Sequence, residues 1–119
     1  MGMHLLMDGY SSDLTSLSSP SIVRELLKSL PKSIGMTPIS RAKVIDYKAK
    51  NPKDSGVTGS IMLAESHITI HTFPKRGYVA IDVLSCKPFN TRTATAAMKK
   101  VFSMEKADVK VIDRRMGDW

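Results

Sequence analysis

One stretch of the sequence gathers the side chains that could do chemistry, the run Ala-Glu-Ser-His-Ile-Thr-Ile-His-Thr-Phe-Pro from Ala64 to Pro74. Within seven residues it holds the carboxylate of Glu65, the hydroxyl of Ser66 and the imidazoles of His67 and His71. A neutral imidazole can act as a general base near pH 7, and a hydroxyl can become a nucleophile beside such a base. The spacing alone completes neither a Ser-His-Asp order nor a phosphate-binding loop.

The two histidines do not form a metal site by themselves. Histidines four residues apart bind zinc well from a helix, but the alternation of this stretch predicts a strand, on which they lie about 13 Å apart on one face. The single cysteine, Cys86, can form no internal disulfide and cannot build a zinc site alone. We therefore expect no metal, and the pattern leaves Cys86 as either a buried apolar residue or a reactive group.

The elements that must position this stretch are mostly strands. Two amphipathic helices are predicted, one over about 20–30 with Ser19 as its cap and Pro31 as its end, and one over about 90–103 with Asn90 as its cap. A polar, serine-rich connection precedes the first helix, and a basic, polar tail follows the last strand. Alternating runs predict strands over 3–10, 39–47, 56–64, 67–73, 78–85 and 109–112.

This order of elements predicts an α/β protein of the α+β type. We expect a two-layer sandwich in which a mainly antiparallel sheet is covered on one face by two helices. The 119 residues can bury one usable core, so a single domain over 1–119 is expected. No apolar run approaches the roughly 20 residues that cross a bilayer, and the N-terminus lacks a signal-peptide pattern. A cytoplasmic protein without a membrane partner is predicted.

The charge balance allows a second class of function. Eighteen Lys and Arg against eleven Asp and Glu give a net charge of +7 and a pI near 9.7, which is compatible with nucleic-acid binding. The positive residues, however, are scattered as pairs and triplets between apolar strands, as on a solvated surface. We therefore expect no nucleic-acid partner.

The sequence around the central stretch carries a resemblance to a known family. Gly56-Val57-Thr58-Gly59 precedes it, and Gly77-Tyr78-Val79-Ala80-Ile81-Asp82-Val83 with Ser85-Cys86 follows it. With these flanks, the chain from about Asp54 to Cys86 closely resembles the prokaryotic S-adenosylmethionine decarboxylase family, nearly without gaps. The flanking order of elements also agrees with that family.

The resemblance implies a self-processing proenzyme. The Ser66 hydroxyl would attack the Glu65 carbonyl, and loss of the Ser66 α-proton would then break the chain into a β chain of 1–65 and an α chain of 66–119. The cofactor would be a pyruvoyl group made from Ser66, to which the substrate amine binds as a Schiff base and which accepts the electrons released with carbon dioxide.

The same resemblance implies roles for three further residues. His71 matches the base that takes the α-proton during processing, and Thr58 stands where a serine hydroxyl is usual. Cys86 matches the proton donor of the catalytic cycle, which suits a thiol that is mostly protonated at neutral pH. The family also implies a homodimer with active sites at the interface, and a place in spermidine biosynthesis.

Two positions depart from the family pattern and leave the substrate open. Lys75 stands where a glutamate is usual, and it cannot replace a bidentate carboxylate that holds a ribose; Lys87 stands where a glycine is usual. Either Lys75 turns to solvent and groups such as Phe73, stacking on an adenine, suffice for S-adenosylmethionine, or the enzyme decarboxylates arginine or ornithine. A cationic side chain would then need carboxylates, for which the candidates are Glu65, Asp54 and Asp82.

A hypothesis from another class remains. The chain could be an unprocessed, non-catalytic relative that serves as a partner subunit or a basic binding module. Lys75, Lys87 and the net charge of +7 support it. The joint presence of Ser66, His71 and Cys86 argues against it, because a binding module has no need of them.

Overall fold

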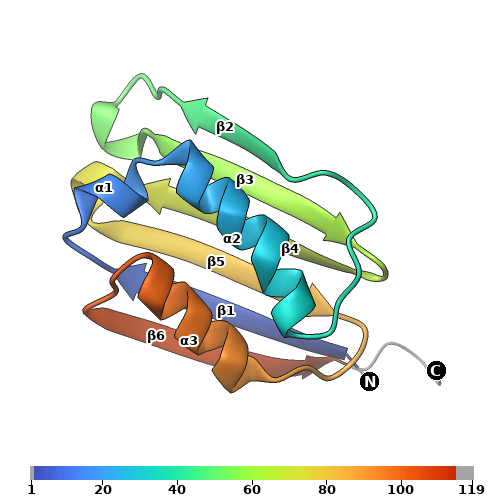
Figure 1. Ribbon diagram of the computed structural model, residues 1–119. Helices are drawn as coiled ribbons and strands as arrows, with labels where there is room; N and C mark the ends of the chain where they lie inside the picture. The colour runs from blue at the N-terminus through green and yellow to red at the C-terminus, as the bar shows by residue number, and fades with distance from the viewer. Residues whose placement is uncertain (1, 115–119) are drawn as a thin grey trace.

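The computed structural model describes residues 2–114. Its helices are α1 (Leu14–Leu17), α2 (Pro20–Ser33) and α3 (Thr91–Val101), and its strands are β1 (Gly2–Tyr10), β2 (Lys43–Tyr47), β3 (Gly56–Leu63), β4 (Ser66–Phe73), β5 (Tyr78–Ser85) and β6 (Lys106–Arg114). Short 3-10 turns lie at η1 (Pro52–Asp54) and η2 (Pro74–Arg76). Over these residues the strands form one antiparallel sheet in the order β2-β3-β4-β5-β1-β6 (Figure 1). The first strand of the chain is thus inserted between β5 and β6.

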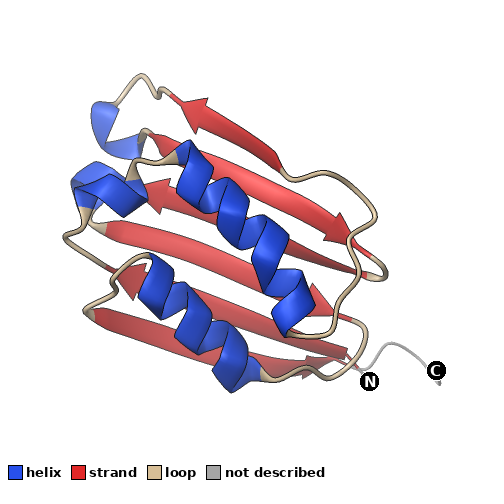
Figure 2. Cartoon of the chain, in the orientation of Figure 1, coloured by secondary structure: helices blue, strands red, loops and turns tan. Residues whose placement is uncertain are grey.

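The two long helices lie on the same face of the sheet, which confirms the predicted two-layer α+β sandwich (Figure 2). Apolar residues at helical spacing on α2 and α3 meet the alternate apolar residues of the central strands, so burial of both sets removes them from water together. The fully buried residues between the layers include Val23, Leu27, Leu30, Met98 and Phe102 from the helical layer. From the sheet they include Leu5, Met7, Ile68, Ile70, Ile81 and Val83.

Helix α2 packs directly on the backbone of β3 at Gly59. A Cβ atom at this position would lie 2.9 Å from Leu27 Cδ1 and 2.9 Å from Val23 Cγ1. Glycine therefore lets the helix approach the strand this closely, because a larger residue would require these buried side chains to shift. This contact fixes where α2 crosses the hairpin that carries Ser66.

The helix starts were predicted correctly, and two details of the helices were wrong. Ser19 Oγ accepts from the Ile22 N–H at 3.2 Å, and Asn90 Oδ1 accepts from the Thr93 N–H at 3.0 Å, as expected of caps. Pro31 does not end α2, which continues to Ser33 around it. The serine-rich connection contains the four-residue helix α1, so the described residues form three helices rather than two.

Two strand boundaries differ from the prediction. Residues 39–42 are not part of β2, although Pro38 forms an isolated bridge with Leu63 and holds this segment beside β3. The last strand extends over Lys106–Arg114 rather than 109–112, because every one of these residues pairs with a residue of β1. The predicted basic tail lies partly outside the described residues.

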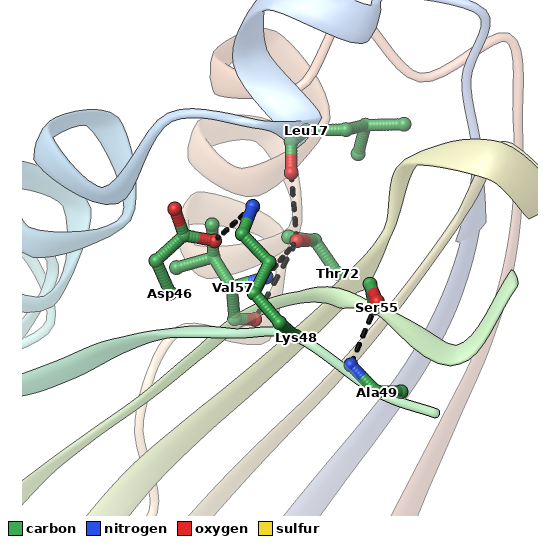
Figure 3. A network of polar contacts seen from close by, with 7 residues as sticks. All are labelled: Leu17, Asp46, Lys48, Ala49, Ser55, Val57 and Thr72. Atoms are coloured by element: carbon green, nitrogen blue, oxygen red, sulfur yellow. Dashed lines mark hydrogen bonds and ion pairs between the residues drawn. The ribbon is translucent and has the colours of Figure 1, made fainter. Parts of the chain in front are cut away.

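Thr72 ties α1 to the far end of the hairpin. Its buried hydroxyl accepts from the Val57 N–H at 2.9 Å and donates to the Leu17 carbonyl at 2.7 Å, where α1 ends (Figure 3). A carbonyl in the last turn of a helix has no partner within the helix, so the hydroxyl supplies one. Nearby, the Ala49 N–H donates to Ser55 Oγ at 2.8 Å and closes the loop before β3.

We expect Thr72→Val to lower the free energy of unfolding by about 1–3 kcal/mol, because valine keeps the shape and leaves a buried N–H and a buried carbonyl without partners. Denaturant unfolding followed by circular dichroism measures this change. Thr69→Val is the matched control on the same strand, since Thr69 lies on the uncovered face and is only half-buried. Equal stability of both variants would show that the Thr72 bonds contribute nothing net.

The second face of the sheet carries no helix within residues 2–114, and we call it the open face. Alternation puts His67, Thr69, His71 and Phe73 of β4 on it. Several large apolar side chains are exposed on the same face, among them Ile45, Tyr47, Met62 and Ile112, with 48–60% of their surface accessible. An exposed apolar sheet face of this kind is typical of an interaction surface.

Candidate active site

Ser66 is the first residue of β4 and follows a two-residue turn. Ala64 and Glu65 form the turn, and Leu63 pairs with Ser66 across it. Glu65 has φ of +54°, the left-handed region that costs a non-glycine residue about 1–2 kcal/mol. The Glu65–Ser66 bond therefore lies in an exposed, strained turn, held in place by a regular ladder on either side.

A small hollow lies against Ser66, and we call it the Ser66 hollow. Its volume is about 140 Å³, and three separate segments line it: Ile34–Thr37 after α2, Ala64–Ser66 in the turn, and Ser85–Phe89 after β5. Ser66 pairs with Ser85, so Cys86 follows directly beyond that pair and lines the same hollow. The structure thus brings Ser66, Glu65 and Cys86 to one place, with the Cys86 thiol half-buried.

Thr58 and His71 form a second pair, on the open face. They lie directly opposite each other on β3 and β4, and Thr58 Oγ1 is 3.2 Å from His71 Nδ1. This contact can hold the imidazole in one orientation, with Nε2 directed away from the hydroxyl. His71 itself is exposed.

The two pairs are far apart within one chain. His71 is the fifth residue after Ser66, which corresponds to about 16 Å along the extended β4. Ser66 also has the strand parity of the covered residues Ile68 and Ile70, whereas His71 points to the open face. A general base must reach its proton within hydrogen-bonding distance, so His71 cannot serve the Ser66 of its own chain in this arrangement.

A wider hollow of about 300 Å³ lies beside His71. Tyr47 and Phe73 line it together with Asp54, Thr58 and His71. Phe73 stacks on Tyr78 with 5.5 Å between ring centroids, and Tyr78 in turn meets Tyr10 at 5.6 Å. The sequence analysis did not identify Tyr47, Tyr78 or Tyr10 as site residues. The alternation along a strand shows which side chains share a face, but it does not show that β1 pairs with β5 and brings Tyr10 to Tyr78.

Lys75 lies outside this wider hollow. It is exposed on η2 and lines a separate hollow of about 180 Å³ with Asp46 and Lys48. Its neighbour Arg76 forms an ion pair of 2.9 Å with Asp54. Asp54 is therefore already engaged, and of the three carboxylates proposed for a cationic substrate only Glu65 lines the Ser66 hollow.

The polar groups of the open face are partly buried between its strands. Tyr78 Oη donates to Asp8 Oδ1 at 2.5 Å, and burial, reinforced by this bond and the Asp8 charge, raises the pKa of Tyr78 to about 12. Asp82 lies on the same face, with a carboxylate oxygen 3.9 Å from His4 Nε2.

Within residues 2–114, no three His, Cys, Asp or Glu residues are arranged to hold a metal ion. None of the helices described there is long and apolar enough to span a membrane.

Comparisons with known proteins agree on one family. A family model described as S-adenosylmethionine decarboxylase matches residues 3–115. The chain is 33% identical over 114 residues to the S-adenosylmethionine decarboxylase proenzyme of Clostridium botulinum strain Loch Maree, covering 95% of this chain and 93% of that protein. It is 36% identical over 115 residues to the proenzyme of that name from Persephonella marina, covering 96% of this chain and 82% of that one.

The likeness extends to a solved structure. The crystal structure of the adenosylmethionine decarboxylase of Aquifex aeolicus VF5 is similar with a TM-score of 0.79 and 29% sequence identity. The similarity covers 99% of this chain and 93% of that one. Sequence and fold therefore point to the same family over nearly the whole of this chain.

Proposed function

The chain belongs to the S-adenosylmethionine decarboxylase family, and from this premise we propose that it decarboxylates S-adenosylmethionine after cutting itself between Glu65 and Ser66. The two products would be a β chain of 1–65 and an α chain of 66–119. The observation that carries this proposal is the family match over nearly the whole chain, together with a serine in a strained turn beside a half-buried thiol. The relatives are named as proenzymes, which fits a chain that is cut before it acts.

The turn suits an attack of Ser66 on its own preceding carbonyl. Transfer of the Glu65 acyl group from the Ser66 nitrogen to Oγ would turn the amide into an ester and release the left-handed strain at Glu65. Removal of the Ser66 α-proton would then break the Cβ–Oγ bond and expel the Glu65 carboxylate. The remaining unsaturated residue would lose its nitrogen by hydrolysis, which leaves a pyruvoyl group at the start of β4.

The residues around Ser66 fit such a group. The Ser66 hollow meets the first residue of β4, has apolar walls from Ile34, Met36 and Phe89, and contains the Cys86 thiol. A pyruvoyl group would supply an electron sink for the departing carboxylate. Cys86 would return a proton to the α-carbon. Glu65 would keep its side chain and its new terminal carboxylate beside the substrate.

We also propose a homodimer in which each copy completes the site of the other. What supports it is the distance of about 16 Å between Ser66 and His71 along β4, which a second copy can bridge and a single chain cannot. The exposed apolar residues of the open face surround the Thr58–His71 pair, so burying this face would bring His71 into an interface. In that pair, Thr58 would orient the imidazole that takes the α-proton of Ser66 on the partner.

The open face also offers a place for an adenine. Tyr47 and Phe73 border the hollow beside His71, and aromatic faces stack well on a planar ring. Arginine and ornithine lack such a ring and could not use these aromatic faces in this way. The relatives described above are named S-adenosylmethionine decarboxylase proenzymes, which favours this substrate. We place the reaction in the cytoplasm, with a product used in spermidine biosynthesis.

We expect Lys75→Glu to lower the KM for S-adenosylmethionine by about fivefold or more, since a unit charge near a sulfonium contributes about 1 kcal/mol at partly solvated range and its sign is reversed. Lys75→Gln is the matched control, because it removes the charge without adding an acceptor pair. If charge alone acts, Gln should give about half the free-energy gain of Glu. A gain from Glu well beyond twice that from Gln supports contact with the ribose, and steady-state kinetics measures both. Unchanged kcat/KM in both variants would remove Lys75 from substrate recognition.

Intact mass and a denaturing gel of the purified protein test the proposed cut directly. Two chains broken at Glu65–Ser66 are expected, and carbon dioxide should be released from S-adenosylmethionine but not from arginine or ornithine. A full-length chain that persists would favour the non-catalytic alternative. Release from arginine or ornithine alone would keep the chemistry and overturn the substrate.

A further inference from the structure

A cavity of about 480 Å³ lies between α2 and the segment that connects it to β2, apart from the Ser66 hollow and the hollow beside His71. Arg24, Lys28 and Lys32 follow one another at every fourth position along α2, so they share one side of the helix and line the cavity together. Arg41 lines it from the connecting segment. Four exposed cationic side chains thus border one open space.

No carboxylate lines this cavity among the described residues. Within the part of the chain that the structure describes, none of the four cations forms an ion pair; the pairs found there engage other residues. Glu25, the one acid of α2, follows Arg24 but is not among the lining residues. Like charges four residues apart on a helix repel each other, so an anion bound beside them would relieve this repulsion.

The cavity is a fixed part of the fold. Arg24 Nη1 donates to the Ala42 carbonyl at 3.1 Å and links α2 to the connecting segment. Ser40 Oγ accepts from the Met62 N–H at 3.0 Å, and the Ile39 N–H donates to the Met62 carbonyl at 3.0 Å. Both walls are therefore anchored to the sheet, which lowers the entropy that a ligand would lose on ordering them.

The cavity surface combines these charges with an apolar part. Pro38 and Ala42 line it from the connecting segment, and the buried Ile61 of β3 lies at its base. The volume falls within the range of about 300–1,000 Å³ that is typical of small-molecule sites. The guanidinium group of arginine and the ammonium group of lysine commonly bind phosphates, and the apolar part of the cavity suits a planar ring.

We propose that this cavity binds a nucleoside di- or triphosphate, with the phosphates among Arg24, Lys28, Lys32 and Arg41 and the base against Pro38, Ala42 and Ile61. The connecting segment links this site to the Ser66 hollow, because Ile34–Thr37 line that hollow and the residues that follow line the cavity. The Ala64 N–H donates to the Thr37 carbonyl at 2.8 Å, so the segment also contacts the turn before Ser66. Occupancy should therefore slow the hydrogen exchange of the amides of residues 34–42 further.

Titration calorimetry of the full chain with adenosine triphosphate, inorganic tripolyphosphate and adenosine tests the proposal. We expect the triphosphate to bind at least about tenfold more tightly than either partial ligand, since only it uses both parts of the cavity. Lys28→Gln combined with Lys32→Gln should weaken it at least about tenfold. Lys99→Gln combined with Lys100→Gln removes the same charge from the last turn of α3 and should leave it within about twofold.

Circular dichroism confirms that both double variants fold, and hydrogen exchange locates the ligand. Protection over 24–42 is expected in the unmodified chain and should disappear in the α2 variant. Equal weakening by the α2 and α3 variants, or protection confined to the hollow beside His71, where an adenine could also stack, would overturn the assignment. Tripolyphosphate as tight as the nucleotide would overturn the nucleoside part, and absence of binding would overturn the whole.

Discussion

Ser66→Ala should remain one chain of 119 residues and should release no carbon dioxide from S-adenosylmethionine above about a thousandth of the unmodified rate. The variant lacks the hydroxyl that would attack the Glu65 carbonyl. Cys86 lines the same hollow, but an alanine at position 66 has no oxygen on its Cβ to eliminate, so no pyruvoyl group can form from it. Intact mass and a decarboxylation assay measure the two effects separately. The fold should be preserved, since the substitution lies at a strand end and removes one atom.

Ser60→Ala is the matched control for this experiment. Ser60 lies on β3 of the same hairpin, is exposed, and belongs to neither of the two proposed site pairs. That variant should be cut and active like the unmodified chain. Normal cutting of Ser66→Ala would show that the bond breaks by another route, and cutting of neither variant would show that the hairpin tolerates no serine replacement.

His71→Ala should also remain uncut when it is the only chain present, with processing slowed about a hundredfold or more by loss of the base. Co-expression with Ser66→Ala gives the decisive result. If His71 of one copy acts on Ser66 of the other, mixed dimers join the intact Ser66 of the first variant to the intact His71 of the second. The His71→Ala chain should then be cut while the Ser66→Ala chain stays whole.

The two variants differ in mass within residues 66–119, so intact mass assigns the α fragment to its parent chain, and native mass spectrometry verifies that mixed dimers have formed. His67→Ala is the control on the same strand and the same face, and it should be processed alone. Mixed dimers without cutting would place the base and the nucleophile in one chain. Normal cutting of His71→Ala alone would remove the imidazole from the mechanism.

The sequence predicts most of the local structure of this fold because local rules determine it. Ser19 and Asn90 could be identified as caps from residue type and position, and the alternation of β4 assigns His67 and His71 to one face. Helix α1 could not be found, since four residues within a serine-rich segment give no periodicity. The insertion of β1 between β5 and β6 depends on pairing over long sequence separations, which no local pattern encodes.

The candidate site shows the same limit. Counting residues along β4 is enough to see that Ser66 and His71 lie far apart, whereas the Ser66 hollow is formed by segments near 35, 65 and 87 that only the fold brings together. Tyr47 was assigned to a strand from the sequence, but its place beside Phe73 requires the register of β2 on β3 and of β3 on β4. The spacing of Arg24, Lys28 and Lys32 puts them on one side of a helix, but only the fold shows that Arg41 lines the same cavity.

The strand order has a consequence for a chain cut at Glu65–Ser66. The piece before the cut would keep β1, β2 and β3, and the piece after it would keep β4, β5 and β6. Because β1 lies between β5 and β6, and β3 is paired with β4, the pieces interlock through three ladders rather than meeting along one seam. They could separate only by losing the sheet. Once denatured, however, they would have to find each other in solution, so recovery of the fold would depend on protein concentration after the cut and not before it.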